Sequence, residues 1–327
     1  PDFRPIAEVA REVGALHDMG GVNIRLGGQS CIFSYMAEGV GRAEIPKPRP
    51  DVLEGLFKKI WAQAPNLRIL HVDNANPAVI SNHKSESEAI LETLVRYTTS
   101  GNVLAMGLES ADPRVKAENN LNTTAEETLE AVEMVNKFGR ERGDNGMPRL
   151  LPGINFVMGL PGESDSTYKL NMRFLHDLLE KKLLLRRINI RQVIDSGRGV
   201  KTNIKRRSFR NFKEWVRREI DTRMLKEMLP KYSAIKGAMV EKREGKWSFL
   251  RQLGSYPLIF AVPYQLKQWE FYSLTVIDWG FRSVTAVERP FLINIAPPSK
   301  LETLPGVGKK RAAKIFKKAP YEDADDL

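Results

Sequence analysis

Hydrophobic and polar residues alternate along the first two-thirds of the chain in patterns that predict helices and strands in turn. Ile6, Val9 and Val13 recur at the spacing of one helix face, and Gly20-Gly21 would end that helix. Residues 22–26 alternate with the two-residue period of a strand. Further helices are predicted to begin at Asp51 and at Thr123 or Thr124 and to cover 85–99, 165–182 and 211–229, with strands over 67–72, 103–108, 154–158 and 188–194.

This order of elements predicts an α/β fold with a parallel sheet, because strands joined by helices of this length form βαβ units. Five strand–helix repeats are expected, which suits either a doubly wound sheet or a barrel. A complete eight-stranded barrel takes roughly 250 residues. Residues 1–229 offer fewer and include long insertions, so an incomplete barrel is the better fit.

The pattern changes after Pro230. Residues 230–296 are rich in β-branched and aromatic side chains that are interrupted by glycine and proline, which predicts a small all-β domain of five or so short strands. Residues 297–327 read as a short helical unit with an acidic tail.

Composition narrows the class of protein. The hydrophobic fraction of 42% is normal for a globular protein, which argues against wholesale disorder. A single cysteine excludes a disulfide framework and any metal site that needs several cysteines of this chain. The cytoplasm is then the expected compartment, and no apolar run is long enough for a membrane helix, so no membrane partner is expected. The first residues carry neither Met nor a signal-peptide pattern, so we expect a mature fragment or a truncated chain.

The net charge of +11 is concentrated in one region. Residues 181–251 carry 22 Lys and Arg against 7 Asp and Glu, whereas the rest of the chain is close to neutral. Such a block attracts polyanions, of which nucleic acid is the commonest. A solvated helix face followed by a basic loop is the simpler alternative.

Glycine and polar residues follow each predicted strand. These segments are Gly27-Gly28-Gln29, Asp73-Asn74, Gly107-Leu108-Glu109-Ser110, Gly159-Leu160-Pro161-Gly162-Glu163 and Arg191-Gln192. Ligands of parallel α/β folds collect at the carboxyl ends of the strands. A carboxylate or amide suits ribose hydroxyls and an arginine suits a carboxylate, so the set favours a nucleoside that bears an amino-acid tail. Loops after strands are also commonly polar and rich in glycine, which is the alternative.

Two of these segments carry a resemblance to a known family. VLAMGLESADPRV and GINFVMGLPGESDSTY resemble the fourth- and fifth-strand motifs of radical S-adenosylmethionine (radical SAM) enzymes, in particular the methylthiotransferase-like branch. Over nearly its full length the chain resembles archaeal uncharacterised radical SAM proteins that end in a helix-hairpin-helix. The segments that carry this second resemblance are RLGGQSCIFSY, LLPGINFVMGLPGE, RRINIRQV, RQLGSYPL and LPGVGKKRAAKI.

The resemblance implies a partial (β/α)6 barrel of the TIM type that binds S-adenosylmethionine (SAM) and a [4Fe-4S] cluster, receives an electron from a donor and forms a 5′-deoxyadenosyl radical. Gly27, Gly28 and Gln29 would then approach the SAM amino group, and Gln29 stands where the family has Glu. Glu109 and Ser110 would meet the ribose, Gly159, Leu160, Pro161 and Gly162 the adenine, and Arg191 the carboxylate, with Asn155 among the binding residues.

The chain departs from this family at the cluster. The family binds its cluster through three cysteines spaced C-x3-C-x2-C after the first strand, whereas this chain has only Cys31. We therefore expect the first strand and the cluster ligands to lie upstream, and this chain alone to be inactive and to hold no metal. Cys31 itself is more typical of a buried small side chain than of a ligand.

The segment Leu304–Ile315 predicts a helix-hairpin-helix. Gly306 and Gly308 would expose backbone N–H groups at a helix N-terminus, and Lys309, Lys310 and Arg311 add positive charge beside them. Together with Lys205, Arg206 and Arg207 they are the expected contacts to a nucleic-acid backbone, RNA or DNA. Such hairpins also serve as packing modules, which is the alternative.

Other chemistry finds less support in the sequence. By its position the β domain resembles the RNA-binding TRAM or OB-like domain of tRNA methylthiotransferases. Its aromatic residues Trp247, Phe249, Tyr256 and Tyr264 suit either base stacking or a small core. The four histidines are scattered and indicate no metal site.

Two alternatives to a nucleic-acid-linked enzyme stay open: an inactive nucleic-acid-binding scaffold, and a radical SAM enzyme for a small molecule. The sequence does not indicate the substrate or the oligomeric state.

Overall fold

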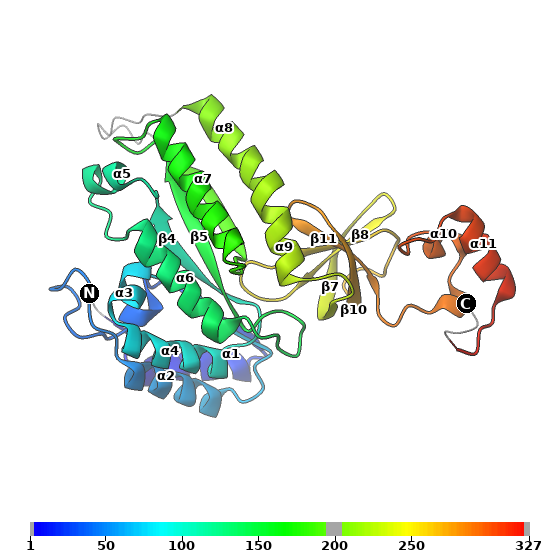
Figure 1. Ribbon diagram of the computed structural model, residues 1–327. Coiled ribbons are helices and arrows are strands. Elements are labelled where there is room, and N and C mark those ends of the chain that lie inside the picture. The colour runs from blue at the N-terminus through cyan, green and yellow to red at the C-terminus, as the bar shows by residue number, and fades with distance from the viewer. Residues whose placement is uncertain (1–2, 194–204, 324–327) are drawn as a thin grey trace. The chain divides into compact units, whose positions relative to one another are not determined.

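A computed structural model describes residues 3–193 and 205–323. The chain forms two compact units (Figure 1). Unit 1 comprises Pro1–Gly143, Met147–Met228 and Gly254–Tyr256, and unit 2 comprises Asp144–Gly146, Leu229–Leu253 and Pro257–Leu327. The expected division of residues 230–327 into a β domain and a separate helical domain stays a prediction.

Unit 1 is built on parallel strands whose spatial order follows their order in the chain. Strand β1 pairs with β2, and β3, β4, β5 and β6 form the next sheet, with Asp73 alone separating β2 from β3. The bounds are β1 (Asn23–Leu26), β2 (Ile69–Val72), β3 (Asn74–Ala75), β4 (Asn102–Glu109), β5 (Leu150–Met158) and β6 (Arg187–Gln192). A doubly wound sheet reverses its strand order at a switch point, whereas a barrel does not. The order is therefore that of a partial barrel.

Helices cover one face of these strands. The helical segments of unit 1 are α1 (Ile6–Asp18), η1 (Ile32–Ser34), α2 (Pro50–Gln63), α3 (Pro77–Asn82), α4 (Lys84–Tyr97), α5 (Pro113–Glu118), α6 (Ala125–Gly139), α7 (Asp165–Glu180), α8 (Arg206–Trp215), the π-helical η2 (Val216–Asp221) and α9 (Thr222–Met228). Leu104, Met106 and Leu108 of β4 point into the core that these helices share with the sheet. Figure 1 shows α6 and α7 beside β4 and β5.

Several predicted boundaries need correction. The helix expected to begin at an Asp51 cap begins at Pro50 with Arg49 as its N-cap, because proline is preorganised for the first helical position. The basic helix begins at Arg206 rather than at residue 211. Strand β5 begins at Leu150, before Pro152-Gly153, which break the strand pattern in the sequence. Of the two expected starts of α6, the structure has Thr124 as the N-cap, in a capping box with Glu127.

Unit 2 contains a closed five-stranded β-barrel. The strands are β7 (Ala234–Glu244), β8 (Trp247–Gln252), β9 (Ile259–Val262), β10 (Phe271–Trp279) and β11 (Ser283–Glu288), in the order β10-β11-β9-β8-β7, and β7 closes the barrel against β10. The small all-β element expected after Pro230 is thus present. Its interior is filled by alternate residues of the strands, such as Leu250, Phe260 and Leu274.

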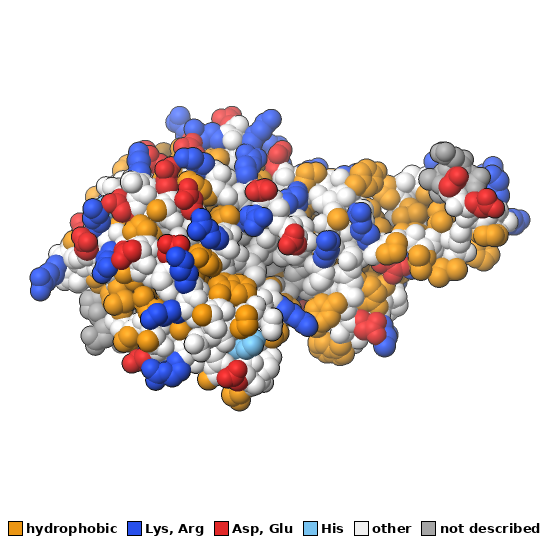
Figure 2. Space-filling model, turned by 90° about the horizontal axis from the view of Figure 1, so that it is seen from below, with side chains coloured by type: hydrophobic (Ala, Val, Ile, Leu, Met, Phe, Trp, Pro, Cys, Tyr) orange, Lys and Arg blue, Asp and Glu red, His pale blue; other side chains and the backbone are white. Residues whose placement is uncertain are grey.

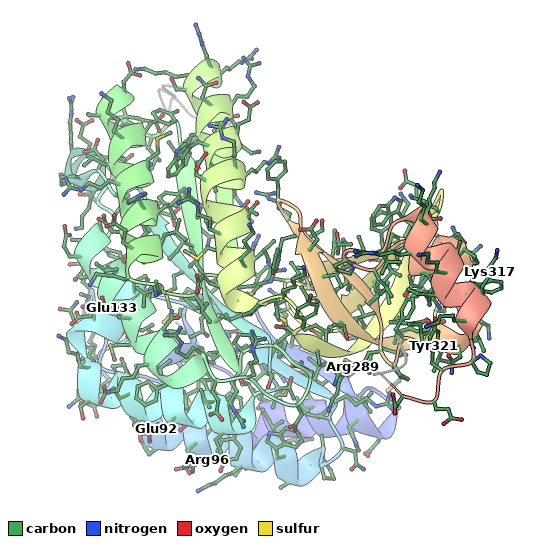
Figure 3. All side chains as sticks on the ribbon, turned by 45° about the vertical axis from the view of Figure 1, so that its right-hand side comes forward. Glu92, Arg96, Glu133, Arg289, Lys317 and Tyr321 are labelled. Carbon is green, nitrogen blue, oxygen red and sulfur yellow. The ribbon has the colours of Figure 1, made fainter. Side chains whose placement is uncertain are left out.

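Short helices follow the barrel: η3 (Ile293–Ile295), α10 (Pro298–Leu301) and α11 (Lys309–Lys318). Ala296, Leu301 and Ala312 are buried together, and Leu304, Val307 and Ile315 pack against them. Tyr321 lies beside α11 and donates its hydroxyl to the carbonyl of Ile315 at 3.0 Å (Figure 3). These apolar side chains hold the short helices together, while the identity of this element as a helix-hairpin-helix stays a prediction. Across the described ranges, no helix has both the length and the apolar character that a membrane crossing requires.

Candidate functional site

The parallel strands of unit 1 have one apolar face under the helices and an opposite face that carries polar side chains toward the carboxyl ends of the strands. Ile154, Phe156 and Met158 of β5 belong to the core under the helices. The residues between them point the other way because successive side chains alternate along a strand. On that opposite face Asn189 Nδ2 donates to Asn155 Oδ1 at 3.1 Å. Strands of a parallel sheet that is buried on both faces are apolar throughout, so the polar face marks the place where a ligand can bind.

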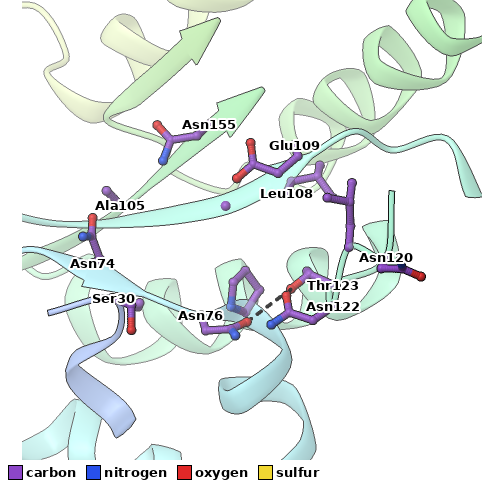
Figure 4. Close-up of a pocket in the computed structure, with 14 residues that line it drawn as sticks. Ser30, Asn74, Asn76, Ala105, Leu108, Glu109, Asn120, Asn122, Thr123 and Asn155 are labelled. Atoms are coloured by element: carbon purple, nitrogen blue, oxygen red, sulfur yellow. Dashed lines mark hydrogen bonds between the residues drawn. The ribbon is translucent and has the colours of Figure 1, made fainter. Parts of the chain in front are cut away.

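A pocket of about 510 Å³ lies at the carboxyl ends of these strands (Figure 4). Its lining comes from the ends of β3, β4 and β5 and from the loop before α6. The polar side chains in the lining are Ser30, Asn74, Asn76, Glu109, Asn120, Asn122, Thr123 and Asn155. The volume lies within the usual range for small-molecule sites.

Glu109 is the only carboxylate among the described residues that line this pocket. It occupies the left-handed region, with φ of 62°, and the pairing of β4 with β5 slips between Gly107 and Glu109. A bulge of this kind turns a strand-end side chain, and non-glycine residues in this conformation gather at functional sites. Burial raises the pKa of the Glu109 carboxyl, and the positive charge of Arg191 opposes the rise. A Cβ at Gly107 would lie 2.5 Å from Glu109 Oε1, so a larger residue there would displace the carboxylate.

Amide and hydroxyl groups form the opposite wall of the pocket. Thr123 Oγ1 donates to Asn76 Oδ1 at 3.2 Å and lies 3.1 Å from Asn122 Oδ1 (Figure 4). Asn76 also caps α3 by accepting from the N–H of Ala78. Sequence reasoning missed this wall, apart from Asn74. The run Asn119-Asn120-Leu121-Asn122 could have indicated it, since amides are common ligands for hydroxyl and amino groups.

The predicted glycine segment lies in a second cavity beside the first. Gly27, Gly28 and Gln29 line this cavity of about 970 Å³, and Ser30, Asn76 and Asn122 line both cavities. Gln29 Nε2 donates to the carbonyl of Leu26 at 3.2 Å, so its amide is already engaged by its own strand end. The structure thus places the first predicted segment in a cavity that adjoins the pocket of Glu109 and Asn155.

Other predicted residues have local partners instead. Ser110 is buried, and its hydroxyl accepts from the N–H of Asp112 at 3.2 Å. In the turn after β5, the N–H of Gly159 donates to Glu163 Oε2 at 2.5 Å, while Asn119 Nδ2 donates to the carbonyl of Pro161. Neither Ser110 nor the segment Gly159-Leu160-Pro161-Gly162 lines the pocket. Their roles toward a ligand stay predictions.

Cys31 behaves as a buried small side chain. Only 5% of it is exposed, and its Sγ accepts from the N–H of Asn76 at 3.2 Å. Burial is the main cause of a raised thiol pKa. Because metals bind the thiolate, this environment disfavours a ligand role.

Residues 254–256 belong to unit 1 and lie against its sheet. The hydroxyl of Tyr256 donates to Asp73 Oδ1 at 2.7 Å, and Asp73 is also paired with Arg25. The guanidinium carbon of Arg187 lies 4.0 Å from the centre of the Tyr256 ring. The N–H of Ser255 donates to Nδ1 of His71, which is 1% exposed. Tyr256, considered above for base stacking or a small β core, is instead engaged by the strands of unit 1.

The residues expected to meet nucleic acid are mostly exposed. Lys309, Lys310 and Arg311 form the exposed first turn of α11, and Arg311 Nη1 donates to the carbonyl of Gly306, whose φ is 82°. Arg206 and Arg207 are exposed at the start of α8. Lys205 is engaged by Asp165 at 2.9 Å.

The basic stretch is only partly described, since Arg198 and Lys201 lie outside the described residues. Figure 2 shows, on the face that it presents, basic side chains interspersed with acidic ones. Among the described residues one group has metal-ligand geometry, His176, Asp177 and Glu180 on α7. It lies toward solvent, and such groups are common without an ion.

No known protein-family profile matches the chain. Among curated proteins it is 44% identical to an uncharacterised protein of Archaeoglobus fulgidus over 318 residues, which are 94% of this chain and 59% of the relative. It is 42% identical to an uncharacterised protein of Methanocaldococcus jannaschii over 294 residues, which are 87% of this chain and 54% of the relative. The chain therefore spans little more than half the length of these relatives.

Two solved structures of radical SAM enzymes are also similar to part of the chain. One is the methyltransferase TsrM of Kitasatospora setae with tryptophan substrate and a SAM analogue bound, with a TM-score of 0.38, 13% identity, and coverage of 56% of this chain and 30% of TsrM. The other is the coproporphyrinogen III oxidase HemN of Escherichia coli, with a TM-score of 0.42, 12% identity, and coverage of 64% of this chain and 43% of HemN. A TM-score below 0.5 does not by itself establish a common fold.

Proposed function

We propose that unit 1 is the SAM-binding part of a radical SAM enzyme. The observation that carries the proposal is Glu109, a half-buried carboxylate set by a bulge at the end of β4, inside a polar pocket where parallel strands end. The same residue belongs to the motif GLES, on which the sequence resemblance rests. Ligand sites at this edge of the sheet are typical of barrels.

The side chains present fit the nucleoside part of SAM. Glu109 would accept hydrogen bonds from ribose hydroxyls, and Asn155 and the amides of the opposite wall would donate to or accept from the base and the ribose. Arg191, whose positive charge is close enough to Glu109 to act on its pKa, is the proposed partner of the SAM carboxylate. Gly27 and Gly28, in the adjoining cavity, would let backbone approach the methionine moiety.

The residues of this chain do not fit a [4Fe-4S] cluster. The cluster takes several thiolates, and the single cysteine is buried with a raised pKa. We propose that the cluster ligands come from a part of the whole protein that lies outside this chain, because the relatives of this chain are longer than the chain itself.

SAM binding by this chain tests the proposal. Titration calorimetry with SAM and with S-adenosylhomocysteine should give saturable binding that Glu109→Gln weakens about tenfold or more, since a hydrogen bond to a charged group is lost. Glu92→Gln, at an exposed position of α4, is the matched control and should bind as the unaltered chain does (Figure 3).

Two results would contradict the assignment: no binding to the unaltered chain, or equal binding by Glu109→Gln. For the whole protein with a reconstituted cluster, absence of reductive SAM cleavage under anaerobic conditions would contradict the enzymatic activity. SAM-independent binding of nucleic acid would then favour the scaffold alternative.

A second proposed function is association with nucleic acid through unit 2. It is favoured by α11, in which Lys309–Lys318 includes six Lys or Arg and no acidic residue. Gly308 provides no side chain to cap this helix, so its first N–H groups and its dipole favour a phosphate. Contacts of this kind bind the backbone without reading the sequence.

Reversing two of these charges should weaken the association. Lys309→Glu with Lys310→Glu is expected to lower the affinity for labelled RNA or DNA about tenfold or more and to reduce its salt dependence, because fewer counterions are released. Lys58→Glu with Lys59→Glu on α2 makes the same change in net charge at exposed positions and is the control. Equal losses in both double variants would mean that only the net charge matters.

A further inference from the structure

Unit 2 contains a pocket that none of the sites above uses. It measures about 840 Å³ and is lined by residues of the barrel strands β8, β10 and β11, by the loops beside them and by the segment from Ser299 to Pro305. Three aromatic residues, Trp247, Tyr264 and Trp279, and two lysines, Lys231 and Lys246, are in this lining. The aromatic residues are half-buried, and the barrel interior is filled by other side chains, so these rings do not serve as the core.

The polar atoms of two of these aromatic residues are engaged by backbone, which fixes their rings. Trp279 Nε1 donates to the carbonyl of Leu229 at 2.8 Å. The Tyr264 hydroxyl accepts from the N–H of Glu288 at 3.0 Å. The rings of Trp279 and Tyr264 are thus held in place before any ligand arrives, which lowers the entropy that these two side chains lose on binding.

The charges around the pocket match a nucleotide. Lys246 and Lys231 are exposed, and Lys246 Nζ lies 5.9 Å from the centre of the Trp247 ring. Lys246 Nζ lies over a face on which a base would stack, so the base would displace this flexible side chain and carry its phosphate close to the ammonium group. Asp278 and Glu302 are exposed in the same lining. Carboxylates repel phosphate but accept hydrogen bonds from the exocyclic amino groups of adenine and cytosine.

We propose that this pocket stacks a base of single-stranded nucleic acid, with Trp247 as the stacking platform and with preference for bases that carry an exocyclic amino group. The inference rests on the nucleic-acid association proposed above and adds the place where an unpaired base is held. It does not depend on SAM binding.

Fluorescence anisotropy with labelled ten-nucleotide oligo(A), oligo(C) and oligo(U) tests the pocket. Trp247→Ala is expected to weaken oligo(A) binding about tenfold, within the range measured for removal of one stacked base. Trp247→Phe keeps a ring and should retain most of the affinity. Trp269→Ala, which removes an exposed tryptophan outside the lining, is the matched control and should bind as the unaltered chain does.

The salt dependence separates this pocket from the helix α11. Trp247→Ala should leave most of the salt dependence in place, because the lysines of α11 remain, whereas the α11 charge reversal should lower the slope. Loss of affinity in Trp247→Ala no greater than in Trp269→Ala, or oligo(U) bound as tightly as oligo(A), would overturn the inference. AMP competing as well as oligo(A), at equal nucleotide concentration, would also overturn it in favour of a mononucleotide site. Failure of the unaltered chain to bind any oligomer would instead remove the association itself.

Discussion

Replacing Gly139 with alanine is expected to lower the free energy of unfolding of unit 1 by roughly 2–4 kcal/mol, the upper range for an overpacked core position. Gly139 is the last residue of α6 and is buried against β5. An added Cβ would lie 2.3 Å from the carbonyl oxygen of Leu150 and 2.7 Å from the Leu150 Cβ. The first of these atoms is backbone within a sheet, so it cannot rotate away. Helix and strand must therefore separate.

Gly55 provides a matched control for this substitution. It lies inside α2, and the nearest atom to its added Cβ would be Ile6 Cδ1 at 4.0 Å. Gly55→Ala should therefore stabilise the protein by up to about 1 kcal/mol through helix propensity alone. Thermal unfolding followed by circular dichroism should give the Gly139→Ala protein a midpoint temperature about 5–15 °C below that of the unaltered chain. Equal midpoints for the two variants would mean that α6 does not approach β5 this closely.

His71 is expected to make the stability of unit 1 fall between pH 6.5 and about 4. Burial lowers the pKa of His71 to about 4, against the ordinary value of 6.5. The unfolded chain therefore takes up this proton first, so the contribution is complete above the unfolded pKa and is lost as the pH falls through the folded one. This shift in the pKa of His71 corresponds to a loss of at most about 3 kcal/mol in the free energy of unfolding.

His71→Asn is the variant that isolates this effect. An asparagine oxygen can accept from the N–H of Ser255 as Nδ1 of His71 does at 2.9 Å, but it does not titrate. Urea unfolding of both proteins across this pH range should show a steeper loss of stability for the unaltered chain, since the other acidic groups are common to both. Parallel curves would contradict a buried neutral histidine at this position.

The candidate SAM pocket could be predicted only in part. Periodicity and strand ends indicated Glu109 and Gly27-Gly28, because a strand's carboxyl end is a local property of the sequence. The sequence did not indicate that Ser110 is buried against Asp112, since a serine after a strand can turn either way. Nor did it indicate the amide wall, because Asn76 and Thr123 meet only when α3 and α6 pack together.

By itself the sequence determined the alternation of helices and strands, the start of a helix at Thr123 or Thr124, the change to a β unit after Pro230 and the scarcity of thiols. These follow from spacing and composition over a few residues. Only the tertiary structure decided the barrel order of the strands and the left-handed bulge at Glu109. It alone also decided that Tyr256 bonds to Asp73, 183 positions earlier in the chain, instead of packing in the β unit. Contacts between such distant positions depend on how the buried faces of helices and strands pack, so a local sequence pattern does not predict them.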